Sequence, residues 1–139
     1  MAHKKQLDRL LRVRTLQLGM TRAAEAQAQD KRASEADLAH RIARLAENVA
    51  PAPAEGNGFA LVAAAHFRSR LHASAEMAQT RLIEADRAAE RAAEATREAR
   101  RDQNAIEKLM ARADADAVLK AIRALEATPP MRKIRHDPC

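Results

Sequence analysis

The apolar residues of this chain recur at helical spacing. In the second half, steps of four and three residues mark one nearly unbroken stripe of small or apolar side chains, most of them alanine. The stripe consists of Leu71, Ala75, Ala78, Leu82, Ala85, Ala89, Ala92, Thr96, Ala99, Gln103, Ile106, Met110, Ala113 and Ala117. A heptad stripe sustained over this length is typical of a coiled-coil helix.

The first half carries two shorter apolar stripes separated by residues 21–37, where the only apolar side chains are alanines. The first stripe is Leu7, Leu10, Leu11, Val13, Leu16, Leu18 and Met20, and the second is Leu38, Ile42, Leu45 and Val49. The same spacing predicts a second long helix, with the charged residues on its outer face.

One proline- and glycine-rich cluster, "APAPAEGNG", separates these halves. Proline removes a backbone donor and clashes in a helix interior, so a helix must end there. We predict helix one over about 4–49, a turn over 50–58, helix two over about 59–127, and a basic tail over 128–139 after "TPP". A short connection makes the helices antiparallel neighbours. The predicted fold is all-α, a single coiled-coil domain over 1–139: a long antiparallel two-helix hairpin with a C-terminal helical overhang.

The register of the hairpin follows from the position of the turn. A tight turn centred near residue 54 places position i opposite about 108 − i, so Leu7 would lie near Arg101 and residues beyond about Asn104 would overhang. We expect another protein to cover this overhang; a third helix folding back and self-association are the alternatives. Its apolar residues are Ile106, Leu109, Met110, Val118, Leu119, Ile122 and Leu125.

Packing quality is expected to vary along the hairpin. The turn end should be best packed, because Phe59, Phe67 and Leu71 would meet Leu38, Ile42 and Leu45 there. The alanine-rich interior should be the weakest part, because alanine contributes little apolar area. Charged pairs such as Glu94–Arg97 should coat the outside.

Composition narrows the functional classes. Of 139 residues, 35 are alanine, 32% are charged and the only aromatics are Phe59 and Phe67, so a thin seam is expected and a thick core with a pocket is not. There is no phosphate-binding glycine loop and no nucleophile motif, and His66 and His72 are six residues apart, which is wrong for a helical metal pair. We expect no enzymatic activity, no cofactor, no metal and no small-molecule substrate.

The charge of +6 is uneven, with basic ends and a balanced middle. A basic tail binds phosphate non-specifically, but the aromatic platforms of single-strand binders are missing, so nucleic acid is not the expected partner. No apolar run approaches the ~20 residues of a membrane span, which predicts a cytoplasmic protein.

The order of elements resembles the FliJ family, the stalk proteins of the bacterial flagellar type III export apparatus, which are related to stalks of virulence secretion systems. The resemblance runs through "LDRLLRVRTLQL" at the start, "FALVAAAHFRSRL" after the turn and "EKLMAR" towards the end. Its most telling residues are Leu7, Leu10, Leu11, Arg14, Phe67, Leu71, Glu107, Lys108, Leu109 and Arg112.

The resemblance implies a function. Such proteins insert the end bearing both termini into the export ATPase hexamer and contact the membrane export gate at the cytoplasmic face of the inner membrane, and some escort export chaperones. It places the ATPase contact at Leu7, Leu10, Leu11, Arg14, Leu109 and Arg112. We assign the gate contact to the exposed face around Arg87, Arg91 and Arg97. Two alternatives stay open: a structural coiled coil that self-assembles through its overhang, and a basic nucleic-acid-associated hairpin.

Overall fold

The computed structural model describes residues 2–49 and 58–130, which form two helices: α1 (Ala2–Asn48) and α2 (Gly58–Glu126). These bounds lie within two residues of the predicted ones. The all-α fold is confirmed, and the described residues include no strand. The predicted turn, apart from Gly58, and the tail from residue 131 onwards lie outside the described residues.

The helix ends follow from local chemistry. Alanine, leucine, arginine and glutamate favour helix throughout both segments. At the end of α2, the Ala127 amide donates to the Arg123 carbonyl at 3.0 Å and the Thr128 hydroxyl donates to the Ala124 carbonyl at 2.8 Å. Pro129 and Pro130 follow and cannot continue the backbone ladder, so the helix stops before them.

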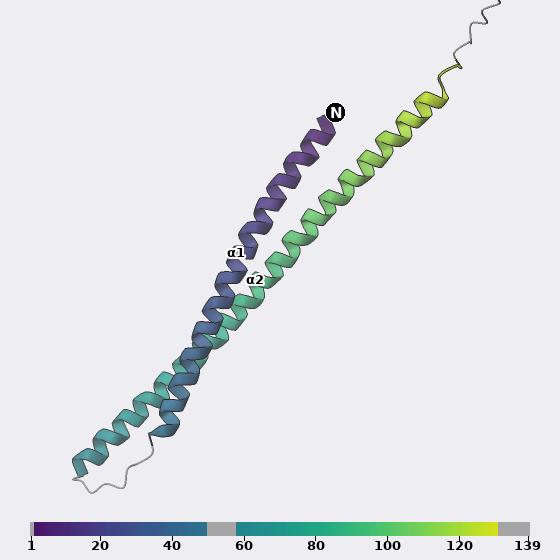
Figure 1. The fold of residues 1–139 in the computed structure, drawn as a ribbon. Helices are drawn as coiled ribbons and strands as arrows, with labels where there is room; N and C mark the ends of the chain where they lie inside the picture. Colours follow the sequence, from purple (N-terminus) through teal and green to yellow (C-terminus); the bar gives the residue numbers. More distant parts are fainter. Residues whose placement is uncertain (1, 50–57, 131–139) are drawn as a thin grey trace, which may run out of the picture. The chain divides into compact units, whose positions relative to one another are not determined.

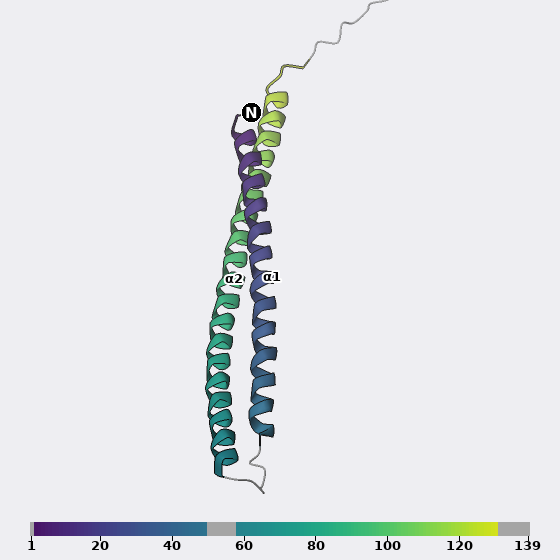
Figure 2. The same cartoon turned by 90° about the vertical axis from the view of Figure 1, so that its left-hand side faces the viewer.

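The chain divides into two compact units. The terminal unit combines residues 2–15 of α1 with residues 101–130, and the middle unit runs from Leu16 to Arg100. Within each unit, α1 and α2 lie side by side and run in opposite directions, as their colour gradients show (Figures 1 and 2). Each unit is therefore an antiparallel helix pair.

On α2, the predicted stripe is the packing face. Ala78, Ala85 and Ala89 are buried, and the other members from Leu71 to Ala113 are half-buried. Only Ala117, the last member, is exposed. The heptad pattern therefore identified the correct face of α2, which we call the seam.

On α1, the packing face differs from the predicted one. Leu38 and Leu45 lie outside it, with 40% and 56% of their surface exposed, as do Leu10, Val13, Leu16 and Met20. Long polar side chains occupy several seam positions because their aliphatic stems can cover the small alanines of α2. The observed face consists of buried Leu7 and Leu18 and half-buried Leu11, Arg14, Thr21, Glu25, Ala28, Glu35, Ala39, Ile42, Ala46 and Val49.

The predicted register is wrong by about ten residues. In the terminal unit, Lys4 pairs with Asp114 and Gln103 donates to Thr15, and both pairs of residue numbers add to 118. In the middle unit, Arg32 pairs with Asp86, which also adds to 118. Leu7 therefore lies opposite about residue 111 and not Arg101. The error came from assuming a tight turn, whereas α1 ends opposite about residue 70, well past the start of α2.

Two further expectations change with the register. The C-terminal overhang begins near Ala117, so Ile106 and Met110 are half-buried in the seam and do not overhang. A second overhang, which was not predicted, covers residues 58–69 of α2. The turn end is consequently poorly packed, with Phe59 86% and Phe67 55% exposed, and the alanine-rich seam contains the most buried residues.

Within the described ranges, neither helix combines the length and apolarity needed to cross a membrane.

Candidate partner-binding surfaces

The terminal unit holds all six residues assigned to the ATPase contact, but they fall into two groups. Leu7 is buried and Leu11 half-buried, so both mainly hold the helices together. Leu10 and Leu109, in contrast, are 46% and 48% exposed. Their residue numbers add to 119, so the register places them across from one another on the same edge of the seam. Two leucines from opposite helices thus offer apolar surface at one place.

The two assigned arginines also differ. Arg14 Nη1 donates to Asp102 Oδ2 at 2.9 Å across the helix pair, which commits part of its guanidinium to the hairpin. Arg112 is exposed and lies one turn beyond Leu109 on the same side of α2. We call Leu10, Leu109 and Arg112 the leucine edge, because together they form the accessible part of the predicted contact.

An ion pair joins the two helices of the terminal unit without neutralising the unit. Lys4 Nζ donates to Asp114 Oδ1 at 2.8 Å, and this hydrogen bond, together with the charge of Asp114, raises the pKa of Lys4. Both side chains are more than half exposed, so the pair adds little stability. The described residues of the terminal unit contain ten Lys and Arg against six Asp and Glu, so this part of the chain has four excess positive charges.

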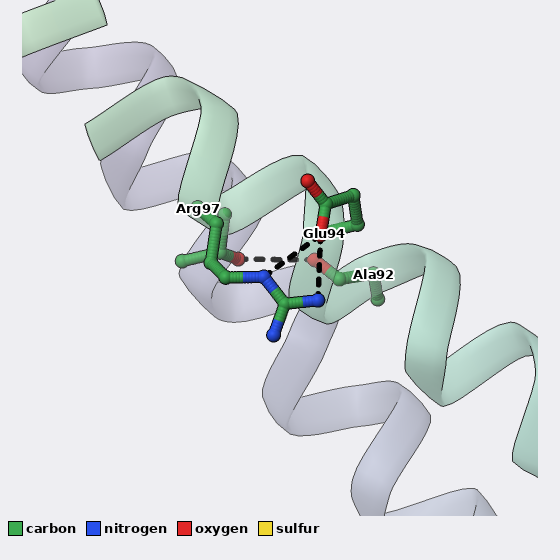
Figure 3. Close-up of polar contacts among 4 residues, drawn as sticks. Ala92, Glu94 and Arg97 are labelled. Carbon is green, nitrogen blue, oxygen red and sulfur yellow. Dashed lines mark hydrogen bonds and ion pairs between the residues drawn. The ribbon is translucent and has the colours of Figure 1, made fainter. Parts of the chain in front are cut away.

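The three arginines assigned to the export gate lie on the outer half of α2 in the middle unit, and all are exposed. Arg97 reaches back one turn to Glu94, with Nε and Nη2 at 2.8 and 2.6 Å from Oε2 (Figure 3). This confirms the predicted Glu94–Arg97 pair and lowers the charge that Arg97 offers. Beside this pair, the Thr96 hydroxyl donates to the Ala92 carbonyl at 3.1 Å (Figure 3).

Arg91 lines a shallow hollow between the helices of the middle unit, together with Lys31 and Arg81. Glu35 and Glu84 line the same hollow, and Glu35 Oε2 is buried with no hydrogen-bond partner among the described residues. Three cationic side chains therefore surround two carboxylates in this hollow, and Arg91 lies on the outer half of α2 by its heptad position. Arg87, one turn away, lies on the outermost face.

Comparison with protein-family models, with curated proteins and with solved structures found no match to this chain in any of the three. What the protein does must therefore be inferred from its own residues and their placement.

The described residues contain no group of three His, Cys, Asp or Glu side chains placed to hold a metal ion. The hollows described in the middle unit are lined mainly by charged side chains and alanine.

Some of the apolar residues predicted for the C-terminal overhang form a stripe on one face of α2. Steps of four and three link Ala111, Ala115, Val118, Ile122 and Leu125, all exposed. We call these five residues the outer stripe, because their heptad positions lie on the side of α2 opposite the seam. The predicted overhang combined Val118, Ile122 and Leu125 with Ile106 and Met110, which belong to the other face.

Proposed function

We propose that this chain is the coiled-coil stalk of a bacterial flagellar type III protein export apparatus. Its terminal unit inserts into the ring of the export ATPase hexamer, and its middle unit reaches the membrane export gate. The observation that supports this best is the antiparallel helix pair, formed by the same sequence elements that resemble the FliJ family.

The physical properties of the terminal unit suit insertion into a ring. It is only two helices in cross-section among the described residues. It contains residues near both ends of the chain, as the family resemblance requires. Its excess of basic residues would speed docking into an acidic pore, and the leucine edge would supply the apolar contact.

The middle unit supplies the second contact of this proposal. Arg87 and Arg91 offer exposed positive charge on the outer half of α2 to an acidic surface of the gate, which would hold the protein at the cytoplasmic face of the inner membrane. Arg97 contributes less, because Glu94 already neutralises part of its charge. Export chaperones that are carried to the gate form a third class of partner.

The test is stimulation of the cognate export ATPase by purified variants. Leu10→Asp and Leu109→Asp place a charge on the leucine edge, whereas Leu45→Asp places the same charge on a leucine of similar exposure in the middle unit. Burying an unpaired carboxylate in a contact costs at least about 1.4 kcal/mol, a tenfold loss in affinity. We expect each edge variant to need about tenfold more protein for half-maximal stimulation, and the control to match the wild type.

Circular dichroism must show that all three variants keep their helices. If the folded edge variants stimulate as well as the wild type, the leucine edge is not the ATPase contact. If the wild-type chain itself leaves the turnover of the export ATPase unchanged, the stalk function is wrong. Stimulation should also weaken with added salt, because the proposed docking depends on the basic surface.

A further inference from the structure

The outer stripe has no partner within the described chain. The exposed fractions of its three large residues run from 45% for Ile122 to 75% for Leu125, and Leu119 beside them is 51% exposed. The stripe points away from the seam, so α1 could not cover it even if α1 were longer. An apolar helical face of four turns is marginal in water without a packing surface.

The charges beside the stripe indicate which surface fits it. When two copies of the stripe pack antiparallel with Val118 of one copy opposite Ile122 of the other, Ala115 lies opposite Leu125 and Leu119 meets its own counterpart. The positions flanking this seam then bring Arg112 of each copy beside Glu126 of the other. The two-fold axis repeats every contact. One register therefore forms the Val118–Ile122 layer twice, the Ala115–Leu125 layer twice and the Arg112–Glu126 pair twice.

A parallel arrangement leaves Glu126 without an opposite charge. It would place Arg112 beside Glu107, but Asp114 beside Leu119 and Ala121 beside Glu126. Asp114 is moreover engaged by Lys4 of its own chain at 2.8 Å. Arg112 and Glu126 are both exposed, so they are accessible to a second copy.

We propose that the outer stripe of α2 is a self-association surface, on which a second copy of this chain packs antiparallel with Arg112 and Glu126 paired between copies. This goes beyond the stalk function and does not depend on it. The contact involves only about four turns of helix per chain, which places it among the small, weak and reversible interfaces.

Sedimentation velocity of the full chain tests the surface directly, across micromolar to millimolar concentrations and with a reducing agent so that Cys139 cannot cross-link copies. We expect a monomer–dimer equilibrium for the wild type. Ile122→Asp should abolish the dimer, because it puts two carboxylates into the paired layers. Leu45→Asp, at an exposed leucine of the middle unit, should leave the equilibrium unchanged.

Charge reversal tests the pairing without altering apolar packing. Arg112→Glu and Glu126→Arg should each weaken the dimer several-fold by opposing like charges, and the double variant should recover wild-type association. Both residues are exposed, so circular dichroism should stay unchanged. A wild type that is monomeric at every concentration, an Ile122→Asp variant that still dimerises, or a double variant without recovery would each overturn the proposal.

Discussion

Alanine fills the most buried positions of the α2 seam, where Ala78, Ala85 and Ala89 are at most 4% exposed. A methyl group covers little area, so the facing helix must supply the bulk. In the middle unit α1 does this with polar side chains such as Glu25 and Glu35, which are half-buried. Their aliphatic stems shield the alanines.

The leucines of α1 therefore differ widely in how much they contribute to the stability of the hairpin. Leu18 is 4% exposed and Leu45 is 56% exposed, although both sit in leucine-rich stretches. Leu18→Ala should destabilise the hairpin by about 2–5 kcal/mol, because it leaves a hole beside the seam. Leu45→Ala should change stability by less than about 0.5 kcal/mol. Urea unfolding followed by circular dichroism measures both, and equal losses would contradict the burial described for Leu45.

The α1 face could not be deduced from hydrophobicity alone, for a reason visible at Leu38 and Ile42. Both are large and apolar, yet Ile42 is half-buried and Leu38 is 40% exposed. A hydrophobic pattern points to the large apolar side chains. Packing against alanine depends instead on side-chain length, and glutamate and arginine are at least as long as leucine. On α2 the pattern identified the packing face correctly, because alanines at heptad positions lie where the two helices approach closely.

At the scale of the elements, the pairing of α1 with α2 is set by the seam. In the middle unit, the register places Ala24 and Ala95, both exposed, on the same edge. Spin labels there, in a Cys139→Ser background, should lie closer together than labels at Ala24 and Glu84. The second pair is offset by about 16 Å along the helices at 1.5 Å per residue. If the labels at Ala24 and Glu84 were instead the closer pair, the register expected from a tight turn would be correct.

The segment 58–69 of α2 should be the least protected helical segment of the middle unit. Phe59, Leu61, Val62 and Phe67 are all exposed, and α1 has no residues opposite this segment. Local opening costs little where few apolar contacts must break. Hydrogen exchange should therefore be faster for amides of 60–69 than for those of 75–89. Equal protection would mean that something outside the described residues packs on this segment.

At the scale of the whole chain, composition and periodicity were enough for the fold class and the helix bounds. Composition and periodicity could not set the register of the two helices. The register depends on which residues of α1 cover the alanines of α2, and this sets how far the end of α1 lies from the start of α2. The same error in register is why the candidate ATPase contact was only partly predicted. Leu109 was placed on an overhang, whereas Asp114, five residues later, still pairs with Lys4 of α1.

The two helices end at different levels on the side where the chain connects them. Asn48 ends α1 opposite about residue 70, while α2 begins at Gly58, so the joined ends do not face each other. Holding both helices in one chain gives each a high effective concentration for the other. Doubling the length of the connection 49–57 by inserting glycine and serine should lower the free energy of unfolding by about 0.6 kcal/mol. Peptides 1–48 and 58–130, mixed as separate chains, should regain the helicity of the intact protein as their concentration rises.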